Sequence, residues 1–448
     1  MPTFALRSVM PASAEALYAW HARPGAFERL NPPFDPVELE ERTGGLEVGA
    51  RTVIRMALGP VKRRWVAEHT AHEPGRMFRD EQREGPFSKW IHTHRFEPRP
   101  DGTSELVDEV EYELPLGGLG ALVGGGFASS TLERMFRYRH ALTKADLERH
   151  ARFADRPRLT VAVTGASGLV GSSLIPFLTT GGHAARGVGR RGAELDPSAL
   201  EGADAVVHLA GAGVADERWT DARKRLLVDS RVAYTKQLVA ALARLDKKPK
   251  VLVSASAIGV YGDRGDEVLT EDSAVGGREG AAGFLAGLCV DWEAAANEAR
   301  ALGVRVVNLR IGLVQSARGG ALAKLLTAFK AGAGGPVGSG RQWQSWIAAE
   351  DLLGAIHHAL FVEALDGPVN AVGPAPVTSA EYAKVLGRVL HRPAVAPLPA
   401  LALRAMFGEL ADGALLASQR VLPTKLEASG FSFLSRDLEA ALRFTLGR

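Results

Sequence analysis

Apolar and polar residues alternate along several short stretches in the first third of the chain. Two series occupy every second position: Thr52, Ile54, Met56 and Leu58, and then Leu106, Val110, Tyr112 and Leu114, with Asp108 interrupting the second series. This period of two is typical of half-buried antiparallel strands. The pattern predicts a sheet with one face on a core and the other in solvent.

Helix signals flank these strands. Pro11, Ser13 and Glu15 predict a helix that begins near residue 11, and residues 26–30 predict a second short helix. After the last strand comes a glycine-rich stretch, residues 117–126. A long helical pattern follows it and carries five large apolar residues: Leu132, Met135, Phe136, Leu142 and Leu147. This part of the chain is therefore expected to form an α+β domain.

The rhythm changes at residue 159, where short apolar strands begin to alternate with helical segments. We expect strands at 159–163, 184–188, 204–209, 250–254 and 304–309. Alternation at this spacing predicts a parallel sheet with right-handed crossovers, hence an α/β fold. Toward the end of the chain it gives way to Pro-rich turns and helices. We therefore divide the chain into four parts: an α+β domain at 1–150, a polar linker at 151–158, a doubly wound Rossmann-like domain at 159–365 and a C-terminal cap at 366–448.

The first strand of the α/β part leads into the sequence TGASGLVG at 164–171. Glycines at three-residue spacing allow a tight turn and the close approach of a pyrophosphate, whose charge the N-terminal amides of the next helix stabilise. Small residues recur at the end of a later strand, in the run HLAGAG at 208–213. Open α/β sheets bind their ligands at such strand ends. The two runs together predict a dinucleotide-binding site.

The strand at 184–188 is followed by Gly189, Arg190 and Arg191, with no acidic residue at its end. NAD-selective sites commonly place an Asp or Glu there to bond the ribose 2′-hydroxyl, whereas an arginine suits a 2′-phosphate. We therefore favour NADP(H) over NAD(H). The alternative, that one of these arginines is simply solvated, does not explain the missing acid.

Composition narrows the possible classes of function. A chain of 448 residues predicts two or three domains, and 46% hydrophobic and 23% charged residues are ordinary for a soluble globular protein. The net charge of +3 gives little support to nucleic-acid binding. We find neither a secretory signal nor a run of the ~18 apolar residues that a membrane span needs. The one cysteine, Cys289, excludes an internal disulfide and fits a reducing compartment, so we expect a cytoplasmic location.

The order of strand, two short helices, several strands and one long helix resembles the helix-grip fold of the START-like (SRPBCC, polyketide cyclase/dehydrase) superfamily. The resemblance covers almost all of the first domain and implies a cavity for an apolar small molecule. His92 and His94 share one face of an expected strand, and we expect ordinary surface or cavity-lining histidines there, with no metal. Arg55, Trp65 and Asp108 are assigned equally to the cavity wall, a solvated face or a domain contact.

Four motifs after residue 158 resemble the extended and atypical short-chain dehydrogenase/reductases: TGASGLVG, DAVVHLAG, ADERWTDARKRLLVDSR and SASAIGVYG. More narrowly, they resemble the NAD-dependent epimerase/dehydratase-like proteins of the SDR39U1 type, and the tail GELADGALLASQRVLPTKLEASGFSF resembles the short C-terminal domain of that subfamily. The resemblance implies a Rossmann-like fold and a set of positions that contact NADP(H): Gly165, Ser167, Gly168, Leu169, Val170, Gly171, Arg190, Leu209, Ala210, Gly211 and Arg231.

The usual catalytic pair of the short-chain dehydrogenases is missing. That pair is Tyr-x-x-x-Lys, in which the lysine lowers the pKa of the tyrosine. None of the six tyrosines has a lysine four residues later, and the resemblance aligns Leu285 and Cys289 with the two positions. Ser256 is the candidate that polarises a substrate oxygen, and Tyr261 is the candidate proton donor. Their alternatives are a hydroxyl bonded to loop backbone and a ring packed with its hydroxyl in solvent. We expect a buried, inert Cys289 thiol and a structural hydrogen bond or ion pair at Glu293.

Three functions remain open at this stage. The first is an NADP(H)-dependent oxidoreductase or epimerase-like enzyme acting on a small molecule. The second, favoured by the missing Tyr/Lys pair, is a non-catalytic protein whose ligand binding responds to NADP(H). The third is an enzyme whose apolar substrate is captured by the first domain. The loop at 338–346, with Arg341, Trp343 and Trp346, is assigned equally to substrate contact and to attachment of the C-terminal cap.

Overall fold

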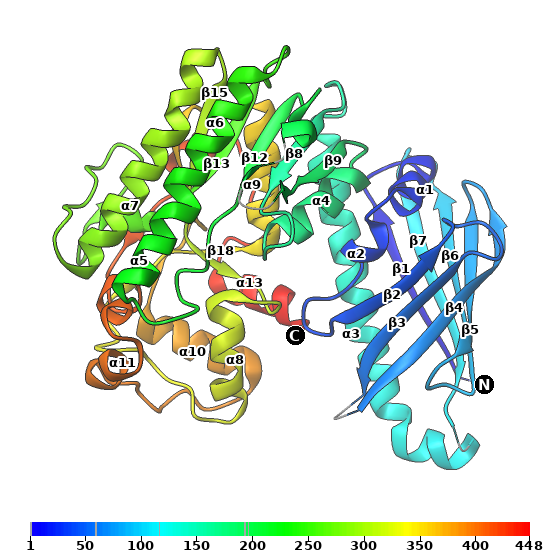
Figure 1. The fold of residues 1–448 in the computed structure, drawn as a ribbon. Coiled ribbons are helices and arrows are strands. Elements are labelled where there is room, and N and C mark those ends of the chain that lie inside the picture. The colour runs from blue at the N-terminus through cyan, green and yellow to red at the C-terminus, as the bar shows by residue number, and fades with distance from the viewer. Residues whose placement is uncertain (1, 59–60, 116, 192–193, 196) are drawn as a thin grey trace. The chain divides into compact units, whose positions relative to one another are not determined.

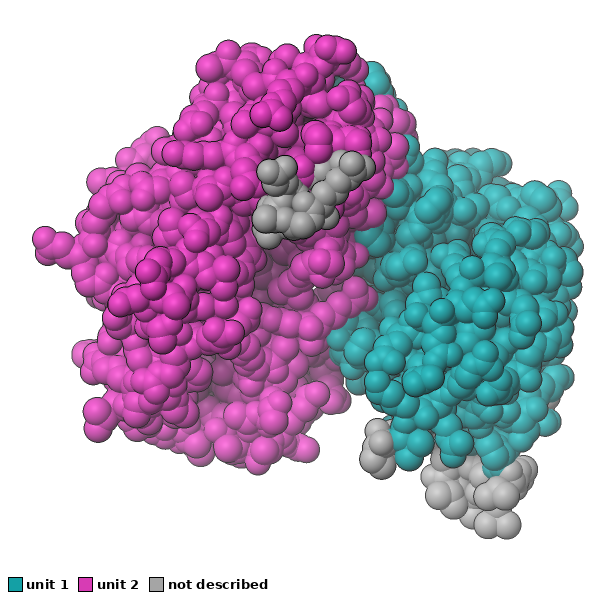
Figure 2. All heavy atoms as spheres, in the orientation of Figure 1, with its two compact units in different colours: residues 1–157, 176–182, 447 teal, residues 158–175, 183–446, 448 magenta. Residues whose placement is uncertain are grey.

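A computed structural model describes residues 2–58, 61–115, 117–191, 194–195 and 197–448 (Figure 1). The chain forms two compact units, coloured separately in Figure 2. The N-terminal unit contains residues 1–157, 176–182 and 447, and the C-terminal unit contains residues 158–175, 183–446 and 448. Within the part of the chain that the structure describes, no helix combines the length and the hydropathy that crossing a membrane requires.

The N-terminal unit is built on one antiparallel sheet of seven strands, in the order β1-β7-β6-β5-β4-β3-β2. The long helix α3 packs against β1 and β7, and α1 packs against β6 and β7. In chain order its elements are β1 (Thr3–Met10), α1 (Ala14–Ala22), α2 (Ala26–Arg29), β2 (Val37–Thr43), β3 (Arg51–Leu58), β4 (Val61–Glu73), β5 (Met77–Glu84), β6 (Lys89–Pro98), β7 (Ser104–Glu113) and α3 (Gly117–Ala151). The predicted α+β domain and its two short helices are confirmed.

Local sequence explains where α1 begins. Ser13 is the N-cap residue, and its hydroxyl accepts a hydrogen bond from the Ala16 backbone amide. Helix α3 differs from the prediction, because its helical backbone already starts at Gly117 inside the glycine-rich stretch. Glycine costs a helix only about 1 kcal/mol per residue. The apolar face farther along α3, which buries Phe136 and Leu142, outweighs that local preference.

Strand β7 also corrects the interpretation of its alternation. Leu106, Val110 and Tyr112 are buried as the pattern predicts, but Asp108 between them is also buried. The carboxylate therefore does not interrupt the inner face of the strand. It belongs to that face.

The C-terminal unit is built on a parallel sheet of six strands, in the order β19-β15-β13-β12-β8-β9. The strands are β8 (Thr160–Thr164), β9 (Ala184–Val188), β12 (Ala205–His208), β13 (Val251–Ala257), β15 (Arg305–Ile311) and β19 (Gly367–Ala371). The helices between them in the chain include α4 (Gly171–Thr180), whose residues from Pro176 onward are grouped with the N-terminal unit, and α5 (Asp221–Val228), α6 (Tyr234–Arg244), α7 (Gly280–Asn297) and α9 (Ala349–Phe361). The predicted α/β alternation is confirmed at every strand named from the sequence.

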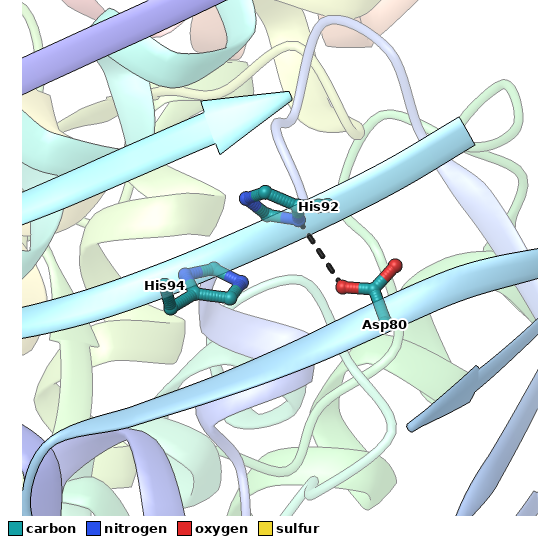
Figure 3. Close-up of side chains that lie close together, drawn as sticks. All are labelled: Asp80, His92 and His94. Carbon is teal, nitrogen blue, oxygen red and sulfur yellow. Dashed lines mark ion pairs between the residues drawn. The ribbon is translucent and has the colours of Figure 1, made fainter. Parts of the chain in front are cut away.

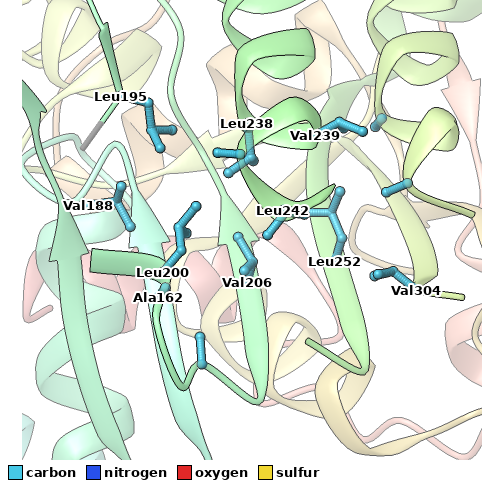
Figure 4. Close-up of a cluster of buried hydrophobic side chains, with 14 of the residues drawn as sticks. Ala162, Val188, Leu195, Leu200, Val206, Leu238, Val239, Leu242, Leu252 and Val304 are labelled. Atoms are coloured by element: carbon cyan, nitrogen blue, oxygen red, sulfur yellow. The ribbon is translucent and has the colours of Figure 1, made fainter. Parts of the chain in front are cut away.

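The core of this unit lies between the sheet and its helices (Figure 4). Val206 of β12 and Leu252 of β13 are fully buried beneath Leu238 and Leu242 of α6. Burying one leucine side chain contributes roughly 1.5–3 kcal/mol to stability. The apolar strands found in the sequence therefore supply the sheet side of this core, and α6 covers it.

Residues after the last sheet strand continue the same compact unit. Helices α10 (Ser379–Leu390) and α13 (Leu438–Leu446) pack together, and their apolar residues join a buried cluster with Trp346 and with Phe329 of α8 (Gly320–Lys330). Thr378 caps α10 in a capping box with Glu381. The separate boundaries of the Rossmann-like domain and the cap stay a prediction.

Candidate dinucleotide-binding site

The strand order reverses between β8 and β12. The chain goes from β8 to β9, which lies next to β8 at the edge of the sheet. It then crosses back to β12, which lies next to β8 on its other flank. Ligands of open α/β sheets bind at this kind of switch point, at the carboxyl ends of the strands. The two small-residue runs singled out in the sequence stand at these two strand ends.

The turn after β8 leaves no room for side chains at two of its glycines. Gly165 has a φ of +67°, and a Cβ added there would lie 2.8 Å from the carbonyl carbon of Leu209. A Cβ added at Gly171 would lie 2.8 Å from the Cα of Ala166 and would also collide with the Gly165 carbonyl oxygen. Helix α4 begins at Gly171 with no acidic residue in its first turn. The helix N-terminus is therefore free of carboxylates that would compete with a bound phosphate.

The loop after β12 rests on a buried arginine. Arg231 lies in the helical turn Asp229–Ala233, and its Nη2 donates a hydrogen bond to the Ala212 carbonyl oxygen at 2.9 Å. A Cβ added at Gly211 would lie 3.2 Å from the guanidinium carbon of Arg231. Burial lowers the pKa of this side chain. Among the described residues no ion pair of Arg231 with a carboxylate is found, and its guanidinium carbon lies 5.2 Å from the centroid of the Trp292 ring.

A buried histidine joins the two strand ends. The His208 ring contacts the Thr164 hydroxyl through Nδ1 at 2.6 Å and the Thr235 hydroxyl through Nε2 at 2.8 Å. Thr235 donates its own proton to the Arg231 carbonyl oxygen, so Nε2–H donates to Thr235 and Nδ1 accepts from Thr164. Burial lowers the pKa of His208 to about 4. The ring is therefore neutral at pH 7.

This network predicts an acid-sensitive fold. Unfolded His208 regains its ordinary pKa of 6.5, while the folded ring titrates at about 4, so stability is complete above pH 6.5 and is lost as the pH falls toward 4. The expected loss from this one group is on the order of 3 kcal/mol. His208→Asn should flatten the dependence of the unfolding free energy on pH, measured by urea unfolding at pH 7 and pH 5. Equal slopes in both proteins would contradict the assignment.

The candidate catalytic residue Ser256 stands near the end of β13. Its hydroxyl donates a hydrogen bond to Glu293 Oε1 at 2.7 Å. Glu293, on α7, forms an ion pair with Arg310 of β15 through two contacts of 2.9 Å. The predicted structural role of Glu293 is thus observed, and it includes Ser256.

The other candidate, Tyr261, is fully buried. Its hydroxyl lies 2.9 Å from the Thr270 carbonyl oxygen and 2.7 Å from Asn370 Oδ1, and it accepts a hydrogen bond from Arg310 Nη1 at 3.0 Å. Burial raises the pKa of Tyr261. The catalytic assignments of Ser256 and Tyr261 stay predictions, and for Tyr261 the observed contacts weigh against a role as proton donor.

The helix face that carries the catalytic pair in other short-chain dehydrogenases is apolar here. Leu285 and Cys289 are both buried on α7. The predicted burial of Cys289 is confirmed, and burial raises the pKa of its thiol to about 12; the inertness of the thiol stays a prediction. Glu293 lies one turn after Cys289 on this face of α7. It is a polar residue of this face that a search for the Tyr/Lys pair does not find.

Two other sequence expectations have different outcomes. Arg190 begins the short strand β10 (Arg190–Arg191), but its side chain lies outside the described part of the structure, so its role stays a prediction. Trp346 is fully buried in the core with α10 and α13, and its Nε1 donates to the Ala375 carbonyl oxygen. The Trp343 backbone amide donates to Ser418 Oγ at 3.0 Å, and the Arg420 guanidinium carbon lies 4.3 Å from the centroid of the Trp343 ring. For these two tryptophans the structure favours attachment of the C-terminal segment.

Comparison with known proteins agrees with this architecture. The family model of the NAD dependent epimerase/dehydratase family matches residues 161–370, that of polyketide cyclase / dehydrase and lipid transport matches residues 10–137, and that of a domain of unknown function matches residues 398–445. The epimerase family protein Mb2239 of Mycobacterium bovis is 42% identical over 301 residues, which is 64% of this chain and 98% of that protein. Human epimerase family protein SDR39U1 is 34% identical over 296 residues, which is 64% of this chain and 99% of that protein.

Two solved structures show the same fold. A nucleoside-diphosphate sugar epimerase from Corynebacterium glutamicum has a TM-score of 0.81 and 34% identity and covers 99% of this chain and 90% of its own. Human SDR39U1 (isoform 2), solved with NADPH, has a TM-score of 0.59 and 32% identity and covers 64% of this chain and 99% of its own.

The fold and the glycine-lined switch point define a Rossmann-type α/β protein of the epimerase/dehydratase class, preceded by a START-like domain. Within that class, the chain belongs to the SDR39U1-like epimerase family. Both resemblances drawn from the sequence are confirmed.

Proposed function

We propose that residues 159–448 bind NADP(H) at the switch point between β8 and β12 and use it as an oxidoreductase or epimerase-like enzyme on a small molecule. The observation that carries the proposal is the pair of backbone loops at Gly165 and Leu209, which meet without space for a Cβ. Beside them lies the buried Arg231, which has no carboxylate partner among the described residues. The NADPH in the structure of human SDR39U1 supports the choice of cofactor.

A bound nicotinamide would supply a hydride donor or acceptor. The groups of this chain would hold the phosphates and orient the substrate oxygen. Amides at the start of α4 and the buried Arg231 suit the pyrophosphate. The Ser256 hydroxyl donates its hydrogen to Glu293 and can still accept a hydrogen bond. To donate a hydrogen bond to a substrate oxygen, it must first turn its hydrogen away from the Glu293 carboxylate.

Selectivity for the 2′-phosphate is assigned to Arg190. Arg190→Ala should weaken NADPH binding by roughly 1–3 kcal/mol, as for a lost charge-assisted hydrogen bond, and leave NADH binding nearly unchanged. Calorimetric titration of the full chain with each cofactor measures both effects. Arg191→Ala, at the next position, is the matched variant and should lose less. Equal losses for NADPH and NADH in Arg190→Ala would refute the assignment.

Turnover is tested separately from binding. The purified chain is mixed with NADPH and a panel of aldehydes and ketones, and the loss of NADPH absorbance is followed. An oxidoreductase would reduce at least one carbonyl compound, and Ser256→Ala would slow that reduction without abolishing NADPH binding. NADPH binding with no consumption across the panel would exclude the oxidoreductase form of the proposal, because an epimerase-like enzyme returns its cofactor unchanged.

The second candidate is a non-catalytic protein whose ligand binding in residues 1–150 responds to NADP(H). The apolar residues Leu285 and Cys289 at the usual catalytic positions favour it, as does the fully bonded hydroxyl of Tyr261. The polyketide cyclase/dehydrase and lipid transport match of the N-terminal unit supports an apolar ligand there. Titration with the apolar dye anilinonaphthalene sulfonate, with and without NADPH, should show a change in dye affinity under this candidate and no change under the first.

A further inference from the structure

Three strands and one helix of the N-terminal unit bring histidines and aspartates to one place. His92 and His94 lie on β6, two residues apart and therefore on one face of the strand. In the sheet register Asp80 of β5 stands opposite His92, and Asp108 of β7 stands opposite His94. Figure 3 shows the two imidazole rings beside each other, with the Asp80 carboxylate directed at His92. This cluster lies outside the dinucleotide site and has no part in the function proposed above.

Asp108 is the hub of the cluster. Its Oδ1 lies 3.1 Å from His92 Nε2 and 2.5 Å from His94 Nδ1, and its Oδ2 lies 2.7 Å from Nε2 of His140 on α3. Nδ1 of His140 in turn contacts the Ser8 hydroxyl at 2.8 Å. Asp108 is therefore hydrogen-bonded to His92 and His140, while His94 Nδ1 lies within ion-pair distance of the same carboxylate without hydrogen-bond geometry.

On each ring of β6, the nitrogen that does not face Asp108 is the candidate metal ligand. Since Asp108 engages Nε2 of His92, the nitrogen of this ring that faces Asp80 is Nδ1, 3.2 Å from Oδ1. On His94, Nδ1 faces Asp108, so Nε2 is available. One ligand atom from each of Asp80, His92 and His94 lies within 4.8 Å of the other two. Bonds of about 2.0–2.2 Å around a tetrahedral ion place ligand atoms roughly 3.3–3.6 Å apart, so side-chain rotations must draw together any atoms that lie near the 4.8 Å limit.

We propose that Asp80, His92 and His94 bind one divalent transition-metal ion, with Asp108 as the carboxylate behind both rings, hydrogen-bonded to His92 and within ion-pair distance of His94. A carboxylate behind a metal-binding histidine is the usual means of setting its tautomer and orientation. Two imidazoles and one carboxylate suit Zn²⁺, Fe²⁺ and Co²⁺. Calcium and magnesium, which prefer oxygen ligands throughout, do not fit this set.

The exposure of the three side chains indicates how the site opens. The side chains of His92 and His94 are 5% and 8% exposed, whereas that of Asp80 is 16% exposed. Solvent therefore reaches the cluster from the Asp80 side. Three protein ligands leave at least one coordination position for water or an exogenous ligand on that side, as in catalytic rather than structural metal sites.

The competing account is a closed ion-pair network without metal. In it the imidazolium of His92 stands between the carboxylates of Asp80 and Asp108 and satisfies both. The sequence analysis expected no metal because it identified only His92 and His94 as possible ligands. The carboxylates of Asp80 and Asp108 come from the neighbouring strands β5 and β7, which the sequence alone does not place beside them. A metal site binds added Zn²⁺ in a fixed ratio, whereas a closed ion-pair network does not.

The test uses the full chain without an affinity tag, because added histidines would themselves bind metal. The protein is stripped with a chelator, dialysed and titrated with Zn²⁺ by calorimetry, and Co²⁺ is added in parallel to follow its visible absorption. We expect about one equivalent of tightly bound Zn²⁺ and Co²⁺ bands of a mixed nitrogen and oxygen site. Asp80→Asn and His94→Gln should each weaken Zn²⁺ binding by at least about tenfold and remove the Co²⁺ bands.

The matched control is His391→Asn, which removes a surface imidazole from the C-terminal unit at a left-handed position that asparagine also adopts. It should bind Zn²⁺ like the unaltered chain. Circular dichroism checks that each variant is folded. The Co²⁺ spectrum of the unaltered chain tests for the mixed nitrogen and oxygen site independently of any variant. Absence of stoichiometric Zn²⁺ binding, or equal Zn²⁺ affinity in Asp80→Asn, His94→Gln and the unaltered chain, would overturn the proposal.

Discussion

Glu293→Ala is expected to lower the free energy of unfolding by about 3–5 kcal/mol, the cost of leaving one member of a buried ion pair without its partner. Glu293 and Arg310 are 12% and 6% exposed and meet through two contacts of 2.9 Å. The substitution also removes the acceptor of the Ser256 hydroxyl. Arg310 would keep only its hydrogen bond to Tyr261 among the described contacts. Urea unfolding at neutral pH measures the loss.

Two variants separate the buried pair from more general effects. Asp291→Ala, on the same helix, breaks an ion pair with Arg278 in which the side chains are 49% and 60% exposed, and it should cost no more than about 1 kcal/mol. Ser256→Ala removes one hydrogen bond and should cost about 1 kcal/mol. A loss in Glu293→Ala no larger than that in Asp291→Ala would show that the buried pair does not stabilise the fold.

Gly171→Ala is expected to weaken NADPH binding by about 10- to 100-fold. The added methyl would lie 2.8 Å from the Cα of Ala166 and would collide with the Gly165 carbonyl oxygen. Both contacts are to backbone, so the turn itself must move. Overpacking of this kind costs typically 1–3 kcal/mol, and each 1.4 kcal/mol is a factor of ten in affinity. Calorimetry with NADPH measures the change.

Gly277→Ala is the matched control for that substitution. Gly277 is exposed, has no positive φ, and a Cβ added there meets nothing within 4 Å. It should bind NADPH like the unaltered chain, with the same thermal unfolding temperature. If Gly171→Ala also kept its NADPH affinity, the turn after β8 would not be the phosphate site.

Most of the fold could be predicted from local pattern. A buried parallel strand is a short apolar run, and β8, β12, β13 and β15 are rich in such apolar residues, whereas β9 at the sheet edge is largely exposed. The glycine turn could be located from its own residues, because a φ of +67°, as at Gly165, favours glycine. These features depend on residues that are close together in the chain.

What could not be predicted depends on residues that meet only in the folded chain. Asp108 looked like an interruption of an apolar face, because its partners His92, His94 and His140 come from another strand and a helix. Tyr261 looked available as a proton donor, because Asn370, one of the residues that engage its hydroxyl, lies 109 positions away. Buried polar groups are satisfied by partners that sequence spacing does not reveal.

The central claim is that this epimerase-family chain carries an NADP(H) site at the glycine turn after β8. Calorimetric titration of the freshly purified full chain with NADPH and, separately, with NADH tests it most directly. We predict saturable binding of NADPH near one equivalent per chain and weaker binding of NADH. No binding of NADPH, or tighter binding of NADH than of NADPH, would contradict the claim.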